Sequence, residues 1–241
     1  ILDRYILRYF DKIVAVSDAL AHFLKGKVRE DALLVIPNGI KIEEFSRETD
    51  ILKKKREIGF DERDMVIGTI GRISPEKGHI YLLKAAKEVC RTRRNVKFII
   101  IGDGPVKKEL ERWVFKNNLS DRIIFTGSIE EIKEVLSVFD IFVLPSQKEA
   151  FGLSLLEAMA CGKAVIATDI GGIPSIVEND KLGVLIKPRN IGLMSDAILE
   201  LLGDENRRLD MGANARNYVN KKYSIDSMIK AYEKLYRDLA L

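Results

Sequence analysis

Six short apolar runs, each followed by a turn and a helical pattern, constrain the fold of this chain more than any other feature. The runs are Met65–Ile70, Val96–Ile101, Arg122–Phe125, Ile141–Leu144, Ala164–Ala167 and Gly183–Ile186. Strands that are apolar on both faces are typical of a parallel sheet covered by helices on both sides. The pattern therefore predicts an α/β fold with a doubly wound, parallel, six-stranded sheet and C-terminal helices. Helices outside the sheet region are expected at residues 51–58, 191–202, 206–222 and 225–239.

The segment before these runs predicts a domain boundary near residue 37. Residues 12–16 and 33–36 have the pattern of two further strands, and Ser17 is placed to cap a helix between them. Pro37–Gly39 then interrupts the pattern. We expect residues 1–37 to be the remnant of a preceding domain, residues 38–222 to form the sheet domain and residues 223–241 to form a terminal helix.

Two loops are expected to meet at one edge of the sheet. In the strand order 3-2-1-4-5-6, ligands bind beyond the carboxyl ends of the strands, where the order reverses. If this sheet follows that order, the loop Gly71–Gly78 (GRISPEKG) meets the loop Pro145–Gly152 (PSQKEAFG). Arg72 and Lys77 then approach a helix start, whose free N–H groups favour an anion. This arrangement predicts a diphosphate site that needs no metal, although a surface loop of salt bridges would have the same residues.

Two glutamates flank the expected helix start. Glu149 lies in the turn before the helix, and Glu157 lies eight residues later, inside it. Carboxylates beside an anion site would accept hydrogen bonds from neutral hydroxyl groups, so the combination predicts a phosphorylated sugar as ligand. The pattern fits equally well a solvated loop charge at Glu149 and an ordinary helix face at Glu157.

Three glycine-rich turns lie near the same edge. Gly102 begins the tight loop Gly102–Pro105, which is either a plain turn or a ligand contact and which lacks the spacing of a dinucleotide fingerprint. Ile129 follows a glycine turn after the third strand, where a base could lie on backbone groups. Gly171–Gly172 is either a turn or a loop that closes on the sugar.

Composition excludes several classes of protein. The chain has 241 residues, 46% hydrophobic and 32% charged, with a net charge of +4, which is ordinary for a globular protein. Two cysteines are too few for a disulfide framework, and no apolar run approaches the roughly 18 residues that span a bilayer. The basic clusters 53–56 and 91–94 are interpreted as solvated helix faces, with a weak attraction to anionic lipid as the alternative. Nucleic-acid binding is disfavoured because no aromatic residues interleave the basic ones.

Five motifs, taken in order, resemble the C-terminal half of the retaining GT-B glycosyltransferases of family 4, also called group 1. They are PNGI at 37–40, GRISPEKG at 71–78, IGDGP at 101–105, FTGSI at 125–129 and EAFGLSLLEAMACGKAVIATDIGGIP at 149–174. The resemblance covers nearly the whole chain and implies a Rossmann-like fold for residues 38–222. It also implies that this part binds the nucleotide-sugar donor.

By this resemblance, Arg72, Lys77 and Glu149 would be the catalytic residues. Arg72 and Lys77 would bind the donor diphosphate and stabilise the departing nucleotide, and Glu149 would contact hydroxyls of the donor sugar. Glu157 would bind the ribose diol, and Ile129 would meet the base through its main chain. The implied donor-binding residues are Gly71, Arg72, Lys77, Gly102, Ile129, Glu149, Ala150, Phe151, Gly152, Leu153 and Glu157.

The helix start would act mainly through its backbone. The amides of Phe151, Gly152 and Leu153 would touch phosphate or sugar, while Ala150 stands where many relatives have glycine. The resemblance further implies transfer of a hexose-type sugar, with retention and without metal or other cofactor, from a UDP or GDP sugar to a sugar or lipid acceptor. The expected setting is polysaccharide or glycolipid synthesis in the cytoplasm, with peripheral association at the inner membrane face.

In this family the acceptor-binding domain precedes the donor-binding one. Residues 1–37 would be its last part, and the terminal helix would cross back to pack on it. We therefore expect the chain alone to bind a nucleotide sugar weakly without turning it over. The alternatives are a non-catalytic sugar-nucleotide binding or scaffold domain, which would be expected to lose Arg72, Lys77 and Glu149, and a GT-B nucleotide-sugar epimerase, against which the spaced glutamates argue.

Overall fold

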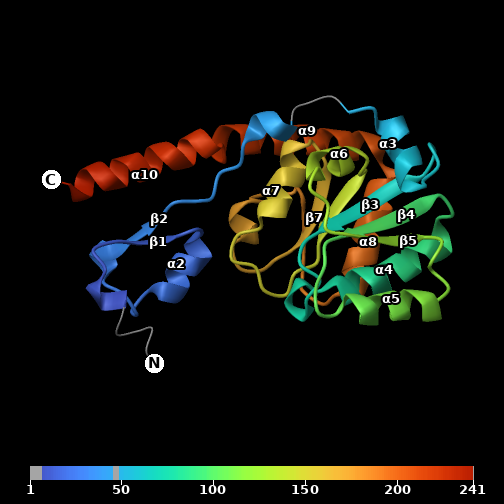
Figure 1. The fold of residues 1–241 in the computed structure, drawn as a ribbon, viewed down its shortest axis with the longest axis horizontal. Coiled ribbons are helices and arrows are strands. Elements are labelled where there is room, and N and C mark those ends of the chain that lie inside the picture. Colours follow the sequence, from blue (N-terminus) through green and yellow to red (C-terminus); the bar gives the residue numbers. More distant parts are fainter. Residues whose placement is uncertain (1–6, 46–48, 241) are drawn as a thin grey trace.

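A six-stranded parallel sheet is the centre of the structure, a computed structural model that describes residues 7–45 and 49–240. The strand order is β5-β4-β3-β6-β7-β8, and every neighbouring pair is parallel (Figure 1). In chain order this is 3-2-1-4-5-6, so the predicted fold and strand order are confirmed. The strands are β3 (Met65–Ile70), β4 (Val96–Ile101), β5 (Ile123–Gly127), β6 (Ile141–Leu144), β7 (Ala164–Thr168) and β8 (Val184–Ile186).

Helices cover both faces of the sheet because successive strand residues point to opposite faces. In β3, Val66 belongs to one apolar cluster and Ile67 to the other, and Phe98 and Ile99 of β4 divide in the same way. One cluster is packed under α6 (Ile132–Ser137) and α7 (Leu153–Ala160) with much of α9 (Glu205–Lys222), and the other under α4 (His79–Thr92), α5 (Lys107–Lys116) and α8 (Ile191–Gly203). Figure 1 shows these two helical layers above and below the strands.

Polar side chains begin several of the helices. Asp50 caps α3 (Ile51–Ile58), Asn190 caps α8 and Asp204 caps α9, each by accepting a backbone N–H of the first turn. Ser224 caps α10 (Ile225–Leu239) in the same way. The predicted cap at Ser17 is confirmed, because its hydroxyl accepts the N–H of Leu20.

The N-terminal segment forms a small unit beside the main sheet. Strands β1 (Ile13–Ala15) and β2 (Leu33–Val35) pair in parallel, with α2 (Asp18–Leu24) between them in the chain. Short 3-10 turns lie at Leu7–Tyr9, Glu30–Ala32 and Ile42–Phe45. The sequence of residues 1–10 also has the pattern of a helix end; residues 7–9 form a single 3-10 turn, and residues 1–6 lie outside the described part.

The chain around residues 39–40 is hydrogen-bonded to the chain around residues 223–225, where α9 ends and α10 begins. The N–H of Ile40 donates to the carbonyl of Tyr223, and the N–H of Ile225 donates to the carbonyl of Ile40. A Cβ on Gly39 would lie 2.5 Å from the Ser224 carbonyl oxygen, so the two strands of chain pack backbone to backbone. The predicted boundaries after residues 37 and 222 thus lie near each other in space, and the division into three parts stays a prediction.

Candidate functional site

The loops after β3 and β6 meet at the carboxyl edge of the sheet, as the strand order predicted. The N–H of Gln147 donates to the carbonyl of Glu76 at 2.7 Å, and that of Lys148 donates to the same oxygen at 3.3 Å. Gly78 has φ +68°, and a Cβ there would lie 2.1 Å from the Pro145 carbonyl oxygen. Only glycine allows both this backbone conformation and this approach.

Lys77 and Glu149 form an ion pair where these loops meet. The Lys77 Nζ lies 2.6 Å from the Glu149 Oε2, and the side chains are 27% and 12% exposed. The Ser146 hydroxyl donates to the same carboxylate oxygen at 3.2 Å, and the Thr168 hydroxyl in turn donates to the Ser146 carbonyl at 2.6 Å. Because Ser146 and Thr168 are buried, this chain of bonds fixes the carboxylate from the protein side. A cation held in so defined a place suits an anionic ligand.

Gly71 starts the loop after β3, and the other predicted cation, Arg72, follows it, two residues beyond the end of the strand. Arg72 is exposed and, among the described residues, forms no ion pair. Gly102, after β4, packs on this loop start: it has φ +135°, and a Cβ would lie 2.0 Å from the Gly71 carbonyl oxygen. The structure therefore gives Gly102 a packing function, which brings the β4 loop against the β3 loop.

Helix α7 begins beside the ion pair. Its N-cap is Gly152, with φ +108°, which supplies no side-chain hydrogen bond to the amides of the first turn. Phe151 is buried and anchors the turn, whereas Leu153 is 46% exposed. Gly152 is buried like Phe151, so the helix start is fixed from behind and reaches solvent at Leu153. Free N–H groups at a helix start favour an anion.

The loop that carries Glu149 is clamped from behind by a glycine pair. Gly171 has φ +55°, and a Cβ there would lie 1.8 Å from the Glu149 carbonyl oxygen. The N–H of Gly172 donates to that same oxygen at 3.2 Å. The Ser17 hydroxyl, from the N-terminal segment, donates to the carbonyl of Ala150 at 2.8 Å. The glycines therefore support the turn through backbone contacts.

Glu157 opens onto a separate hollow of about 380 Å³ on the other side of α7. Burial raises the pKa of Glu157 above its usual range. Ile129 is half-buried and packs against the apolar cluster next to the chain segment that lines this hollow. The lining residues are Glu44, Phe45, Glu130, Glu131, Ile132, Lys133 and Glu157.

Sequence reasoning missed Glu44 and Phe45 in this hollow. They lie in the stretch of residues 41–49, which is polar and shows no strand or helix pattern. Phe45 is packed against the apolar cluster, and a single aromatic residue in a polar stretch was the available signal. The site predicted from the sequence is therefore two neighbouring places on α7: the Lys77–Glu149 pair before its start and the Glu157 hollow along its side.

The described residues also bear on metal, thiol and membrane chemistry. No group of three or more His, Cys, Asp or Glu side chains is placed to hold a metal ion there. Burial raises the pKa of the Cys161 thiol to about 11, which leaves it protonated and weakly nucleophilic at neutral pH. None of the described helices is both long and apolar enough to cross a membrane.

Comparison with known proteins gives a consistent result. A family model described as glycosyl transferases group 1 matches residues 50–218. The alpha-D-kanosaminyltransferase of Streptomyces kanamyceticus is 29% identical over 99% of this chain, which spans 63% of that relative's length. The Anabaena protein HepE, solved in complex with UDP and glucose, superimposes with a TM-score of 0.90 at 24% identity, over 98% of this chain and 65% of that one.

A third similarity is to a single domain. The C-terminal domain of a glycosyl transferase group 1 family protein (LpcC) from Francisella tularensis is 32% identical, with a TM-score of 0.71, over 78% of this chain and 100% of that one. The fold and the family match over residues 50–218 agree. The chain belongs to the glycosyl transferases group 1 family.

Proposed function

We propose that this chain is the donor-binding part of a retaining family 4 glycosyltransferase, which transfers a hexose-type sugar from a nucleotide diphosphate sugar without a metal ion. The observation that carries the proposal is the Lys77–Glu149 pair, 2.6 Å apart at the place where the strand order reverses. Open α/β sheets bind their ligands at this place. A cation and an acid side by side match the two chemistries of the donor, an anionic diphosphate and a hydroxylated sugar.

The positive charges of Lys77 and Arg72 would stabilise the negative charge that develops in the reaction. Cleaving the bond between sugar and phosphate builds negative charge on the diphosphate, so cations fixed in advance lower the barrier more than they tighten binding of the intact donor. Lys77 would supply such a charge from a defined position, and exposed Arg72 would close on the phosphates with its planar fork. The amides of Phe151, Gly152 and Leu153 would add hydrogen bonds at the start of α7. Glu149 would accept hydrogen bonds from sugar hydroxyls.

The nucleoside would lie along the other side of α7. Glu157 would accept the ribose diol, and Ile129 would meet the base through its main chain. Phe45 lines the hollow beside Glu157 and would contact a flat base there. UDP and GDP sugars are both candidate donors, and Anabaena HepE, which shares the fold, is solved with UDP and glucose.

The activity of the whole protein extends this proposal. A sugar or lipid acceptor would bind in an additional domain, as in polysaccharide or glycolipid synthesis on the cytoplasmic side of the membrane, with peripheral association there. The chain would then bind donor by itself and release no transfer product.

Titration calorimetry tests the proposal directly. We expect the chain to bind one of UDP, GDP or ADP, to bind its sugar conjugate also, and to bind the matching nucleoside more weakly. Lys77→Ala should weaken nucleoside diphosphate binding by about tenfold or more, because a charge-assisted contact is lost, and should leave nucleoside binding nearly unchanged. Lys116→Ala, at an exposed lysine on α5, is the matched control. Equal losses for both ligands in the Lys77 variant would show that the lysine is not at the phosphates.

A further inference from the structure

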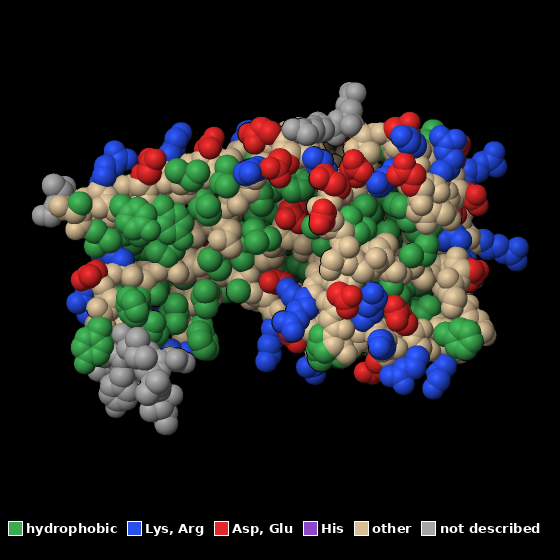
Figure 2. Space-filling view, in the orientation of Figure 1, with side chains coloured by type: hydrophobic (Ala, Val, Ile, Leu, Met, Phe, Trp, Pro, Cys, Tyr) green, Lys and Arg blue, Asp and Glu red, His purple; other side chains and the backbone are tan. Residues whose placement is uncertain are grey.

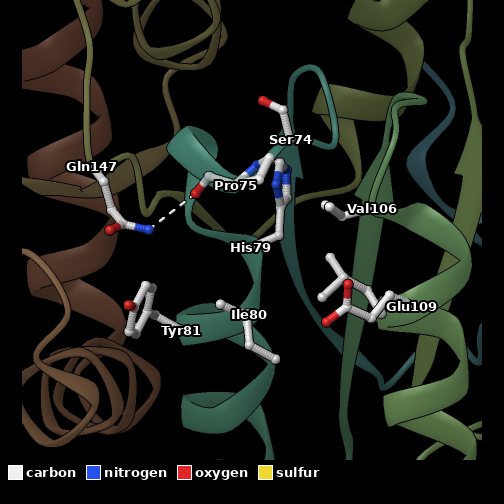
Figure 3. Close-up of a pocket in the computed structure, with 9 residues that line it drawn as sticks. Ser74, Pro75, His79, Ile80, Tyr81, Val106, Glu109 and Gln147 are labelled. Atoms are coloured by element: carbon white, nitrogen blue, oxygen red, sulfur yellow. Dashed lines mark hydrogen bonds between the residues drawn. The ribbon is translucent and has the colours of Figure 1, made fainter.

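Gln147, in the loop after β6, forms hydrogen bonds that reach the loop after β3 and the loop after β8. Its Nε2 donates to the Pro75 carbonyl at 3.0 Å, the contact drawn in Figure 3, and its backbone N–H donates to the Glu76 carbonyl at 2.7 Å. Pro75 begins the short 3-10 turn Pro75–Lys77. Gln147 therefore ties the turn that ends in Lys77 to the loop that continues to Glu149.

A third loop holds the other end of the same amide. The Arg189 Nε donates to the Gln147 Oε1 at 2.6 Å. Arg189 lies between β8 and α8, and its φ of +64° is uncommon for a residue other than glycine. Such a conformation costs free energy, and it persists where the surrounding contacts hold it in place. The side chain that this backbone presents is the partner of Gln147.

The Gln147 amide suits both of its side-chain partners. One end must donate to a carbonyl and the other must accept from a guanidinium, and both ends of Gln147 are used in this way. A glutamate would place a carboxylate oxygen against the Pro75 carbonyl, and a leucine would satisfy neither partner. The bonds thus join three loops at the edge where the proposed donor would bind.

Besides the Gln147 amide, backbone hydrogen bonds from Gln147 and Lys148 to the Glu76 carbonyl hold the turn that ends in Lys77. A hollow of about 260 Å³ lies behind it, lined by Ser74, Pro75, His79, Ile80, Tyr81, Val106, Glu109, Leu110 and Gln147. His79 points into this region in Figure 3, and its Nδ1 is buried with no hydrogen-bond partner among the described residues. Because the space behind the turn is not filled by side chains, the turn's position depends on its hydrogen bonds.

We propose that Gln147 is a positioning residue, which holds the Lys77 turn against the Glu149 loop and is itself oriented by Arg189. Its effect would be on the diphosphate end of the ligand, through the distance between Lys77 and Glu149. The nucleoside end, at Glu157 on the far side of α7, would not depend on it. The proposal rests on the proposed function of this site.

The test compares the wild-type chain with Gln147→Leu, which keeps most of the volume and removes both hydrogen bonds. Calorimetry would measure the binding of the preferred nucleoside diphosphate and of its nucleoside. We expect Gln147→Leu to weaken diphosphate binding by about tenfold, the effect of losing one or two hydrogen bonds that fix the turn, with nucleoside binding unchanged within twofold. Thermal unfolding of the same samples would confirm that the fold is retained.

Arg189→Gly separates positioning from general stability. Glycine accepts the positive φ without strain, so this variant should unfold at the same or a higher temperature while it binds diphosphate more weakly. In the double variant, the second change should add little to the first, because both remove the same support. Additive losses would instead mean that Arg189 acts on the ligand as an independent charge, which would overturn its part of the proposal.

The outcomes separate this proposal from the one it rests on. If the wild-type chain binds no nucleoside diphosphate, the proposed function fails and the role of Gln147 fails with it. If the wild type binds and Gln147→Leu binds equally well, the positioning role alone is overturned. A Gln147→Leu variant that loses nucleoside and diphosphate binding to the same extent would also overturn it, because the damage would then be general.

Discussion

At the scale of single residues, the charged side chains of the site differ in their exposure to solvent. Glu149 is 12% exposed and already paired with Lys77, whereas Arg72 is exposed to solvent. A partly buried pair loses more when one partner is removed than a surface pair does, because the remaining charge stays desolvated. A change at Lys77 or Glu149 therefore also alters the partner, so binding of the diphosphate and binding of the sugar must be measured separately.

The variant Glu149→Gln gives such a test. The amide removes the negative charge beside Lys77, so a nucleoside diphosphate would no longer compete with a carboxylate and should bind equally or more tightly. The hydroxyls of the donor sugar would lose a charged acceptor, and the extra affinity that the sugar confers should fall by about tenfold. Calorimetry with a nucleoside diphosphate and its sugar conjugate measures both effects. An unchanged sugar contribution would exclude Glu149 from the sugar site.

Glu157 predicts a pH dependence for the nucleoside end. Burial raises its pKa above the usual value of 4.5, so the group takes up a proton earlier than an exposed glutamate as the pH falls. A protonated Glu157 accepts ribose hydroxyls poorly, so nucleoside binding should weaken as the pH drops through this raised pKa. Glu157→Gln should bind about tenfold more weakly at neutral pH and show no such step. A step of the same size in both proteins would assign the titration to another group.

The raised pKa of Glu157 also affects stability: the ionised carboxylate that would favour nucleoside binding costs folding free energy. A carboxyl whose pKa is higher in the folded state contributes stability below its ordinary pKa and loses that contribution as the pH rises through the raised value. The ionised Glu157 therefore costs stability at neutral pH. Glu157→Gln should unfold at the same or a higher temperature at pH 7 while binding more weakly, and chemical denaturation at several pH values would measure this.

At the scale of elements, the sequence predicted the parts of the structure that arise from periodicity. Helix α10 spans Ile225–Leu239 as expected, and α8 and α9 differ from their predicted ranges by one residue at one end each. Strand β5 continues to Gly127, beyond the last apolar residue, because its backbone still pairs with Ile101 of β4. The apolar pattern marks the buried part of a strand, whereas the backbone pairing that defines the strand can continue beyond it.

The contacts that make the site specific leave no such local pattern. The strand order allowed the meeting of two loops to be predicted, but the ion pair joins residues 77 and 149, and the Gln147 amide joins residues 75 and 189. Which side chains pair across so many residues depends on the final backbone positions. Glu44 and Phe45 were missed for the same reason, since a 3-10 turn brings them to α7. The functions of the site residues stay predictions.

Gly78→Ala tests the close approach of the two loops. At Gly78, alanine would have an unfavourable positive φ and would also collide with the Pro145 carbonyl, 2.1 Å away. Gly59 has a similar φ of +85° with nothing within 4 Å, so Gly59→Ala is the matched control. We expect the control to lose about 1–2 kcal/mol of unfolding free energy and Gly78→Ala to lose clearly more, together with nucleoside diphosphate binding. Denaturation and calorimetry would measure both, and equal losses in the two variants would contradict the packing argument.

At the scale of the whole molecule, α10 leaves the main body and runs beside the N-terminal segment (Figure 1). Its apolar residues recur at helical spacing, yet Leu235 is its one buried residue. Ile229, Tyr236 and Leu239 are 45%, 66% and 45% exposed. Figure 2 shows apolar side chains gathered along α10 and over the adjoining N-terminal segment, which also exposes Phe23. A contiguous exposed apolar surface of this kind favours association with another surface.

We therefore expect the chain to self-associate through α10 at high concentration. Ile229→Lys combined with Tyr236→Lys should weaken this association by about tenfold or more, because two large apolar side chains would no longer be buried in the contact. Asp238→Lys, on the opposite side of the same helix from Ile229 and Tyr236, adds positive charge without removing apolar surface and is the matched control. Sedimentation over a range of concentrations would measure the association. Because these side chains are exposed in the single chain, neither change should alter the unfolding temperature of the dilute protein appreciably. A wild-type chain that stays monomeric at the highest concentration, or a control that dissociates equally well, would show that the apolar face of α10 is not the contact.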